Sequence, residues 1–228
     1  MDHNPILCAI DTNELARAQS LIAATASAVG GVKLGLEFFV AHGPGGIRMA
    51  AAGQMNVFLD LKLHDIPSTV AGAVKSSLVL DPLLLTVHCG GGPAMMRASV
   101  EARGSARTKI VGVTVLTSLD DNDLAAVGQS APAAAQVRRL ALLAQASGLD
   151  GVVCSPQEVA MLREACRKDF LLVVPGIRPA GAAVGDQKRV QTPRDAIAAG
   201  ADYLVIGRPI TEAPDPGAAA RAILADLP

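Results

Sequence analysis

Two carboxylates and a lysine stand close together in the segment Asp60-Leu61-Lys62-Leu63-His64-Asp65. In an extended strand, residues two apart face the same side, so Asp60 and Lys62 are expected to point together out of an otherwise apolar run. Burying two charges is costly and an isolated buried pair is a poor route to stability, so this placement favours a functional role. By spacing alone, the same residues also fit a salt-bridge network at a strand end.

Two further charged residues belong to neighbouring apolar runs. Asp11 follows the run that begins at Ile6, and Lys33 interrupts the run that begins at Val32. If adjacent strands place these residues at the same height in the sheet, carboxylates and ammonium groups alternate there. Opposite charges favour the ionised form of each neighbour, and a protonated lysine is the state that can deliver a proton. The pattern therefore predicts proton-transfer chemistry.

Asp65 is separated from this group. It lies five residues beyond Asp60, up to about 16 Å away along an extended chain at ~3.3 Å per residue. Pro67 restricts the backbone of Ile66 and is well placed to open a helix. Asp65 therefore need not share a pocket with Asp60, and this geometry leaves it able to project sideways into the pocket of a partner chain.

The elements that must position these residues follow a regular pattern. Short apolar runs alternate with alanine-rich segments of helical period, as in βα units rather than hairpins. Eight such units predict an α/β fold, a (β/α)8 TIM barrel that forms a single domain over residues 1–228, with reactive groups at the carboxyl ends of its strands. The turn after the first run has no glycine, which argues against an open dinucleotide-binding sheet. The eight runs are Ile6–Asp11, Val32–Phe38, Asn56–Leu63, Leu83–His88, Ile110–Thr117, Gly151–Ser155, Leu171–Pro175 and Tyr203–Gly207.

Composition and charge argue against several classes of protein. The 20 Lys and Arg residues balance 21 Asp and Glu, so no net field attracts nucleic acid or an anionic membrane. No Trp and only one Tyr leave few aromatic platforms for stacking single-stranded bases. No apolar run approaches the roughly 20 residues of a membrane span, the N-terminus does not resemble a signal peptide, and the four cysteines form no Cys-x-x-Cys pair. We expect a cytoplasmic protein with no nucleic-acid or membrane partner.

The segment from Asp60 to Thr69 resembles the signature Asp-x-Lys-x-x-Asp-Ile-Pro-x-Thr of the orotidine 5′-phosphate decarboxylase family. The resemblance implies a barrel that dimerises with its active sites at the interface. It also implies cofactor-free and metal-free decarboxylation of orotidine 5′-monophosphate to uridine 5′-monophosphate in pyrimidine biosynthesis. Further matching segments are Ala9-Ile10-Asp11, Val32-Lys33-Leu34-Gly35, Val113–Ser118, Val174–Pro179, Gln187 and Ile206–Ile210.

The resemblance implies roles for individual residues. Lys62 would protonate C6 of the pyrimidine as carbon dioxide leaves, and Asp60 would face the substrate carboxylate. Lys33 and Asp65 would complete the catalytic set, Asp65 acting in the neighbouring subunit. The implied substrate-binding residues are Ile66 and Thr69 from the neighbouring subunit, Asp11 and Lys33 at the ribose, Thr117 and Ser118 near the ribose and pyrimidine, and Gln187, Gly207 and Arg208 at the phosphate, with Arg178 on the loop that closes over it.

Two other functions remain open. A metal-dependent sugar-phosphate enzyme, such as a 3-keto-gulonate 6-phosphate decarboxylase or hexulose-phosphate synthase, shares the Asp-x-Lys-x-x-Asp core, although the continuation from His64 to Thr69 argues against it. A non-catalytic sensor of nucleotide phosphates on a barrel scaffold would bind uridine 5′-monophosphate without any turnover.

Other features fit structural as well as functional roles. His64 and His88 could serve as acids, bases or metal ligands, but no grouping has metal-ligand spacing and we expect hydrogen-bonded structural roles. The triplet Gly90-Gly91-Gly92 is expected to form a strand-to-helix turn. The stretch from Ile177 to Thr192 is long for a barrel loop, and it is either a lid or a plain surface loop.

Overall fold

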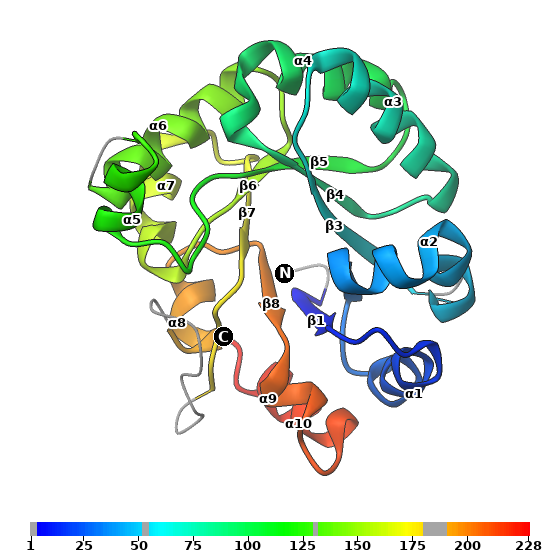
Figure 1. Ribbon diagram of the computed structural model, residues 1–228. Coiled ribbons are helices and arrows are strands. Elements are labelled where there is room, and N and C mark those ends of the chain that lie inside the picture. The colour runs from blue at the N-terminus through cyan, green and yellow to red at the C-terminus, as the bar shows by residue number, and fades with distance from the viewer. Residues whose placement is uncertain (1–3, 52–54, 130–131, 180–190) are drawn as a thin grey trace.

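A computed structural model of the chain describes residues 4–51, 55–129, 132–179 and 191–228. Eight parallel strands pair in sequence order, and the last pairs with the first to close a barrel (Figure 1). The predicted α/β class and (β/α)8 TIM barrel are therefore confirmed. The strands are β1 (Ile6–Ile10), β2 (Gly31–Gly35), β3 (Val57–Leu63), β4 (Leu84–His88), β5 (Lys109–Val113), β6 (Gly151–Val153), β7 (Leu171–Val174) and β8 (Tyr203–Ile206).

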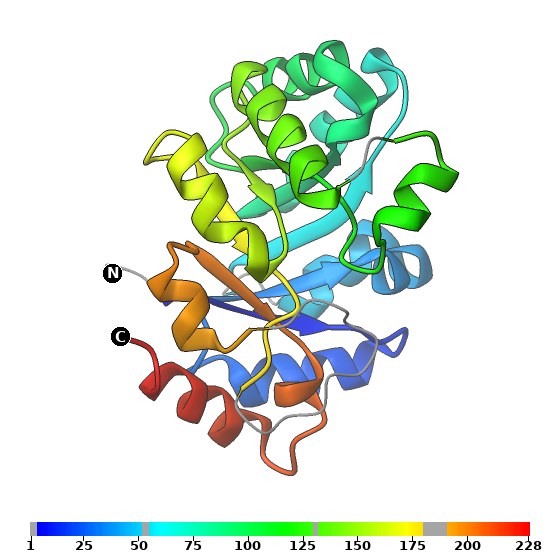
Figure 2. The same ribbon diagram turned by 90° about the vertical axis from the view of Figure 1, so that its left-hand side faces the viewer.

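Helices surround the strands in both views of the molecule (Figures 1 and 2). Local sequence sets where several begin: Pro67 occupies the first turn of one helix, and the Thr192 side chain accepts the N–H of Asp195 at the start of another. No helix among the described residues is long and apolar enough to cross a bilayer. The helices are α1 (Leu15–Thr25), α2 (Leu36–Ala51), α3 (Pro67–Ser77), α4 (Gly92–Arg103), α5 (Asp121–Ala126), α6 (Ala133–Ala146), α7 (Val159–Ala165), α8 (Pro193–Ala198), α9 (Arg208–Thr211) and α10 (Pro216–Ala225), with short 3-10 helices η1 (Leu78–Leu80), η2 (Cys89–Gly91) and η3 (Pro156–Glu158).

Two predicted strands end earlier than the apolar pattern suggested. The run Val32–Phe38 is a strand only to Gly35, after which α2 begins, and the run Ile110–Thr117 is a strand only to Val113. Beyond these points Phe38 and Val115 are still buried, whereas Leu36 and Leu116 are exposed. Burial alone therefore could not mark the residue where ladder hydrogen bonding stops.

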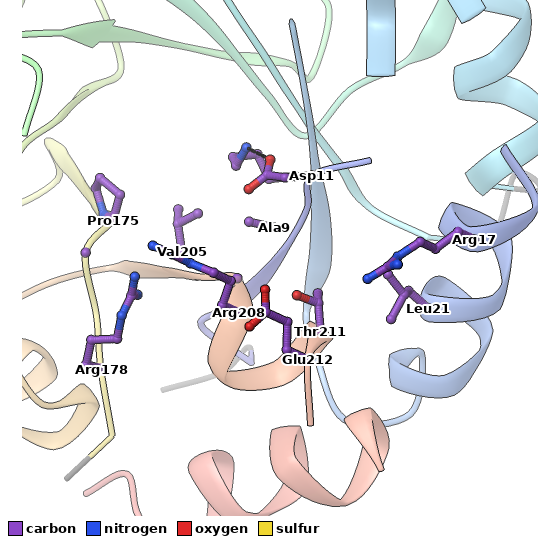
Figure 3. Close-up of a pocket in the computed structure, with 13 residues that line it drawn as sticks. Ala9, Asp11, Arg17, Leu21, Pro175, Arg178, Val205, Arg208, Thr211 and Glu212 are labelled. Carbon is purple, nitrogen blue, oxygen red and sulfur yellow. Dashed lines mark hydrogen bonds and ion pairs between the residues drawn. The ribbon is translucent and has the colours of Figure 1, made fainter. Parts of the chain in front are cut away.

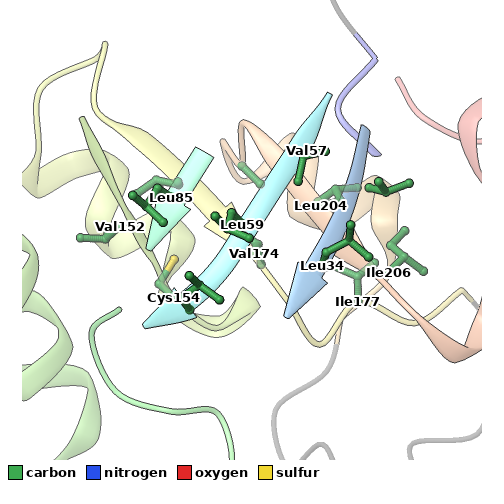
Figure 4. Close-up of a cluster of buried hydrophobic side chains, with 14 of the residues drawn as sticks. Leu34, Val57, Leu59, Leu85, Val152, Cys154, Val174, Ile177, Leu204 and Ile206 are labelled. Carbon is green, nitrogen blue, oxygen red and sulfur yellow. The ribbon is translucent and has the colours of Figure 1, made fainter. Parts of the chain in front are cut away.

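The core has two apolar layers. Outward-facing strand residues pack against the helices, and Figure 4 shows part of this layer, with Leu34, Leu59 and Ile206 among its members. The next inward positions toward the carboxyl ends of β1 and β3 are Asp11 and Asp60, so polar groups begin where the apolar filling stops. The inner layer consists of Leu7, Ala9, Phe58, Leu84, Val111, Val173 and Val205.

Candidate active site

Four charged side chains form a continuous array at the carboxyl ends of β1, β2 and β3. The Lys33 Nζ donates to Asp11 Oδ1 at 3.0 Å and lies 3.8 Å from Asp60 Oδ2. The Lys62 Nζ donates to the same Asp60 oxygen at 2.8 Å. The side chains of Lys33 and Asp60 are only 13% and 12% exposed, so each charge depends on its neighbours for compensation. The fold thus brings together residues that are far apart in the sequence.

Lys62 reaches this array through an irregular backbone rather than through simple strand alternation. Its φ is 50°, in the left-handed region that residues other than glycine seldom occupy. The pairing of β3 with β4 also shifts register between Leu59 and Leu63. Strained backbone of this kind is concentrated at functional sites. Asp60 and Lys62 do point together, as expected, but a bulge produces the arrangement.

The larger of two neighbouring cavities holds about 390 Å³ and opens beside Asp11 and Lys33. Figure 3 shows Arg208 between Arg178, which comes from the β7 side, and Arg17, which comes from α1. Guanidinium groups bind phosphate and carboxylate oxygens well, so this end of the site suits an anionic group. The remaining lining residues are Ala9, Leu21, Pro175, Gly176, Val205, Gly207, Thr211 and Glu212.

The smaller cavity holds about 150 Å³ and shares Lys33 with the larger one. Asp60, Lys62 and Thr117 are its other polar lining residues, apart from a buried thiol. A mostly apolar slot with charge at one edge suits a flat ring that carries an ionised substituent. The remaining lining residues are Phe58, Val113, Val115, Leu116, Val153, Cys154, Pro175 and Val205.

The predicted site residues fall into three sets. Those that line one of these cavities are Asp11, Lys33, Asp60, Lys62, Thr117, Arg178, Gly207 and Arg208. Those that are exposed and line neither are Asp65, Ile66, Thr69 and Ser118. Gln187 lies outside the described residues, as does most of the predicted lid.

Sequence reasoning missed Thr86, which is fully buried in β4 and bonds to both Asp60 and Lys62. A signal was available, because Thr86 is a polar residue two positions after the inward-facing Leu84. The sequence also provided no reason to select Arg17 or Glu212, which reach the larger cavity from the surface.

His64 and His88 stack on each other beside the charged array. Their ring centroids lie 5.0 Å apart at an interplanar angle of 9°, and the Nδ1 of His88 accepts the N–H of Gly90 at 3.1 Å. Burial lowers the pKa of His88, and the nearby His64 and Lys62 lower it further. These contacts support the structural role expected for the pair. Among the described residues, no group of three or more His, Cys, Asp or Glu could hold a metal ion.

The glycine turn after β4 leaves room for this stack. A Cβ on Gly90 would lie 3.0 Å from the Nδ1 of His88, and one on Gly91 would lie 3.2 Å from the His64 ring and would also clash with Met95. The triplet therefore has a packing reason in addition to the strand-to-helix turn that we predicted.

Known proteins resemble the chain over nearly its whole length. A family model described as "Orotidine 5'-phosphate decarboxylase / HUMPS family" matches residues 4–223. A curated orotidine 5′-phosphate decarboxylase of Thermobifida fusca (strain YX) is 54% identical over 224 residues, which cover 98% of this chain and 95% of the relative. Another from Rhodospirillum rubrum is 52% identical over 235 residues, covering 100% of this chain and 95% of the relative.

A solved structure shows the same fold. The crystal structure of orotidine 5′-phosphate decarboxylase from Lactobacillus acidophilus matches with a TM-score of 0.85 and 37% sequence identity. The match covers 96% of this chain and 97% of that one. Similarity in sequence and similarity in fold thus point to one family.

Proposed function

The chain belongs to the orotidine 5′-phosphate decarboxylase / HUMPS family, and we propose that it decarboxylates orotidine 5′-monophosphate to uridine 5′-monophosphate and carbon dioxide in pyrimidine biosynthesis. The curated relatives carry the name of this carboxy-lyase. The observation that carries the proposal is the alternating array of Asp11, Lys33, Asp60 and Lys62, with an arginine-lined cavity on one side and an apolar slot on the other.

The chemistry requires a cation beside one carbon atom. When the bond between C6 and the carboxylate breaks, the electron pair remains on C6 while carbon dioxide leaves. The Lys62 ammonium stabilises that charge as it forms and then transfers a proton to C6. Asp60 holds this ammonium at 2.8 Å, so the proton donor is oriented before the substrate binds. The proposed step uses no cofactor.

Asp60 has a second role in the proposal. Its carboxylate lies against the smaller cavity, where it faces the carboxylate of the substrate. The two carboxylates are both negatively charged and repel each other, and the departure of neutral carbon dioxide relieves the repulsion. Binding energy from distant phosphate contacts offsets this unfavourable placement.

The larger cavity takes the ribose 5′-phosphate. Arg178, Gly207 and Arg208 line it and would contact the phosphate. Gln187, which lies outside the described residues, is proposed to contact it as well. Asp11 and Lys33 line the same cavity and would bind the ribose hydroxyls. Thr117, which lines the smaller cavity, and the adjacent Ser118 would lie near the ribose and the pyrimidine.

The active form is proposed to be a homodimer with shared sites. Asp65 is exposed, and its Oδ1 accepts the N–H of Ile66 at 2.6 Å. Ile66 is 64% exposed, and Leu36 and Val40, which follow the end of the adjacent β2, are 50% and 81% exposed. Exposed apolar side chains at one end of the barrel support a subunit contact there. Asp65, Ile66 and Thr69 would then complete the site of the partner.

The remaining expectations are also proposals. The single barrel is proposed to account for residues 1–228 as one domain. A cytoplasmic location is proposed because all four cysteines, Cys8, Cys89, Cys154 and Cys166, are buried, and buried cysteines are ordinary in a reducing compartment.

The direct test is an assay of the purified protein with orotidine 5′-monophosphate in excess chelator, with uridine 5′-monophosphate and carbon dioxide measured together. We expect equal amounts of both products and no effect of the chelator. Loss of activity on metal removal would favour a metal-dependent sugar-phosphate enzyme. Binding of uridine 5′-monophosphate without turnover of the substrate would instead identify a nucleotide-phosphate sensor.

The shared site has a separate test. Chains with Lys62→Ala and chains with Asp65→Ala are each expected to be inactive, and mixing them should restore activity. One of the two pockets in a hybrid dimer keeps both Lys62 and the Asp65 of the neighbouring chain, so statistical mixing should recover about a quarter of the wild-type activity. No recovery, despite subunit exchange demonstrated by mass spectrometry, would place Asp65 outside the neighbouring site.

A further inference from the structure

Thr86 occupies an unusual place between β3 and β4. Leu59 pairs with Leu85 and Leu63 pairs with Val87, so three residues of β3 lie opposite the single residue Thr86. Extra residues in one strand leave backbone groups without ladder partners. The Lys62 N–H lies within this bulge, and the Thr86 Oγ1 accepts its hydrogen bond at 2.8 Å.

The same hydroxyl also contacts the charged array. The Thr86 Oγ1 donates to Asp60 Oδ1 at 3.0 Å, and the other oxygen of that carboxylate accepts from the Lys62 Nζ at 2.8 Å. Three hydrogen bonds lead from the Lys62 N–H through the hydroxyl and the carboxylate to the Lys62 ammonium. The side chain of Lys62 itself closes the ring. The Thr86 hydroxyl can make both of its hydrogen bonds because a hydroxyl is a donor and an acceptor at once.

Burial makes this ring rigid. Thr86 has no exposed surface, and its side chain lines neither cavity. The hydroxyl therefore has no water as an alternative partner, and a buried polar group without a partner costs free energy. The ring therefore helps to hold Lys62 in its strained, left-handed backbone conformation.

We propose that Thr86 is a positioning residue, which orients the Asp60 carboxylate and the Lys62 ammonium for proton delivery without touching the substrate. This inference rests on the proposed decarboxylation and deepens it. Loss of the hydroxyl lets the ammonium drift from the developing charge at C6, where placement within about 0.5 Å matters. The contacts to ribose and phosphate lie elsewhere, so substrate binding is unaffected.

Three substitutions separate the hydroxyl from the volume of the side chain. Thr86→Val keeps the shape and loses the hydroxyl, Thr86→Ser keeps the hydroxyl and loses a methyl group, and Thr86→Ala loses both. We expect kcat to fall roughly 10- to 100-fold in the Val and Ala variants, with KM within about threefold of wild type and near-wild-type kcat in the Ser variant.

A matched control lies at the opposite end of the barrel. Thr108 is also fully buried, and its hydroxyl donates to the carbonyl of Pro82 at 2.8 Å. Thr108→Val removes a buried hydroxyl of the same kind, so its loss of stability should resemble that of Thr86→Val while its kcat stays unchanged. Stability is measured by urea unfolding, and kcat is expressed per folded molecule.

The outcomes are decisive. If kcat follows side-chain volume, with Val active and both Ser and Ala impaired, Thr86 only packs and the inference is overturned. An unchanged kcat in all three variants overturns it as well. A wild-type protein that does not decarboxylate orotidine 5′-monophosphate would instead remove the proposed function itself, before any variant is compared.

Discussion

The two ends of the barrel both carry buried or half-buried ion pairs, but they use them differently. At the amino end, Asp150 Oδ2 lies 2.7 Å from the Arg103 Nη1 and accepts the N–H of Ile110 at 2.8 Å. At the carboxyl end, the Asp60 carboxylate accepts from the Lys62 ammonium and from a threonine hydroxyl. The lengths of the contacts are similar, so ion pairing alone does not identify the active end.

The difference lies in what else the carboxylates contact. Asp202 repeats the pattern of the amino end, because its Oδ2 accepts from the Arg163 Nη2 at 2.6 Å and from the N–H of Leu172 at 2.7 Å. These carboxylates tie a helix to the backbone of a strand. Asp60 instead faces a cavity, and the neighbouring lysine has a strained backbone. The cavity distinguishes the site for chemistry from a structural network, because left-handed backbone also occurs at Asp81, which pairs with Arg107 before β4.

Lys62→Ala should cause the largest effect at the carboxyl end. We expect kcat for orotidine 5′-monophosphate to fall at least about 10⁴-fold, because one substitution removes both the proton donor and the cation beside C6. Lys109→Ala is the control at the amino end, since Lys109 lies 3.4 Å from Asp150 and 49% of its side chain is exposed. Residual activity above about 1% in Lys62→Ala would show that Lys62 is not the proton donor.

Asp202→Ala should cause a large loss of stability at the amino end. The change leaves the Arg163 guanidinium without its carboxylate and the Leu172 N–H without an acceptor, and we expect a loss of roughly 3 kcal/mol. Urea unfolding measures it, with kcat per folded molecule unchanged. Asp226→Ala, which breaks the exposed pair with Arg194, should cost less than about 1 kcal/mol. Equal losses in the two variants would contradict the structural role of the amino end.

A smaller effect tests strain at the carboxyl end. A protein with glycine within a strand is normally less stable than the same protein with alanine there. At φ 50° the order should reverse, because only glycine adopts this conformation freely. We expect Lys62→Gly to be more stable than Lys62→Ala by about 1 kcal/mol, as measured by thermal or urea unfolding. An alanine variant at least as stable as the glycine variant would mean that the backbone there is not strained.

The smallest effect concerns the stacked histidines. Burial, together with His64 and Lys62, lowers the pKa of His88 below its ordinary value of 6.5, so the folded protein binds the proton less tightly than the unfolded chain. The stabilising contribution is present above pH 6.5 and is lost as the pH falls through the lowered pKa. Unfolding free energies measured between neutral and acidic pH should decline less in His88→Gln than in the wild type. Parallel declines would exclude His88 as the cause.

The repeating pattern of the sequence predicted most of the fold. Apolar runs such as Leu171–Pro175, separated by helical segments, indicated eight parallel strands, and residues such as Asp11 followed them at the expected end. The segment from Asp60 to Thr69 resembled one family, and the comparisons confirmed that resemblance. These features are local, so a single sequence displays them directly.

The tertiary structure decided how the site is assembled. The pairing of Lys33 with Asp11 and Asp60 depends on which strands are adjacent, and the contact of Thr86 with Asp60 joins residues 26 positions apart. The bulge at Lys62 depends on the register of β3 against β4. Register and bulges arise from hydrogen bonds between distant segments, which no local pattern of residues encodes. The sequence by itself therefore determined the barrel and its reactive groups, and only the closed sheet decided how those groups meet.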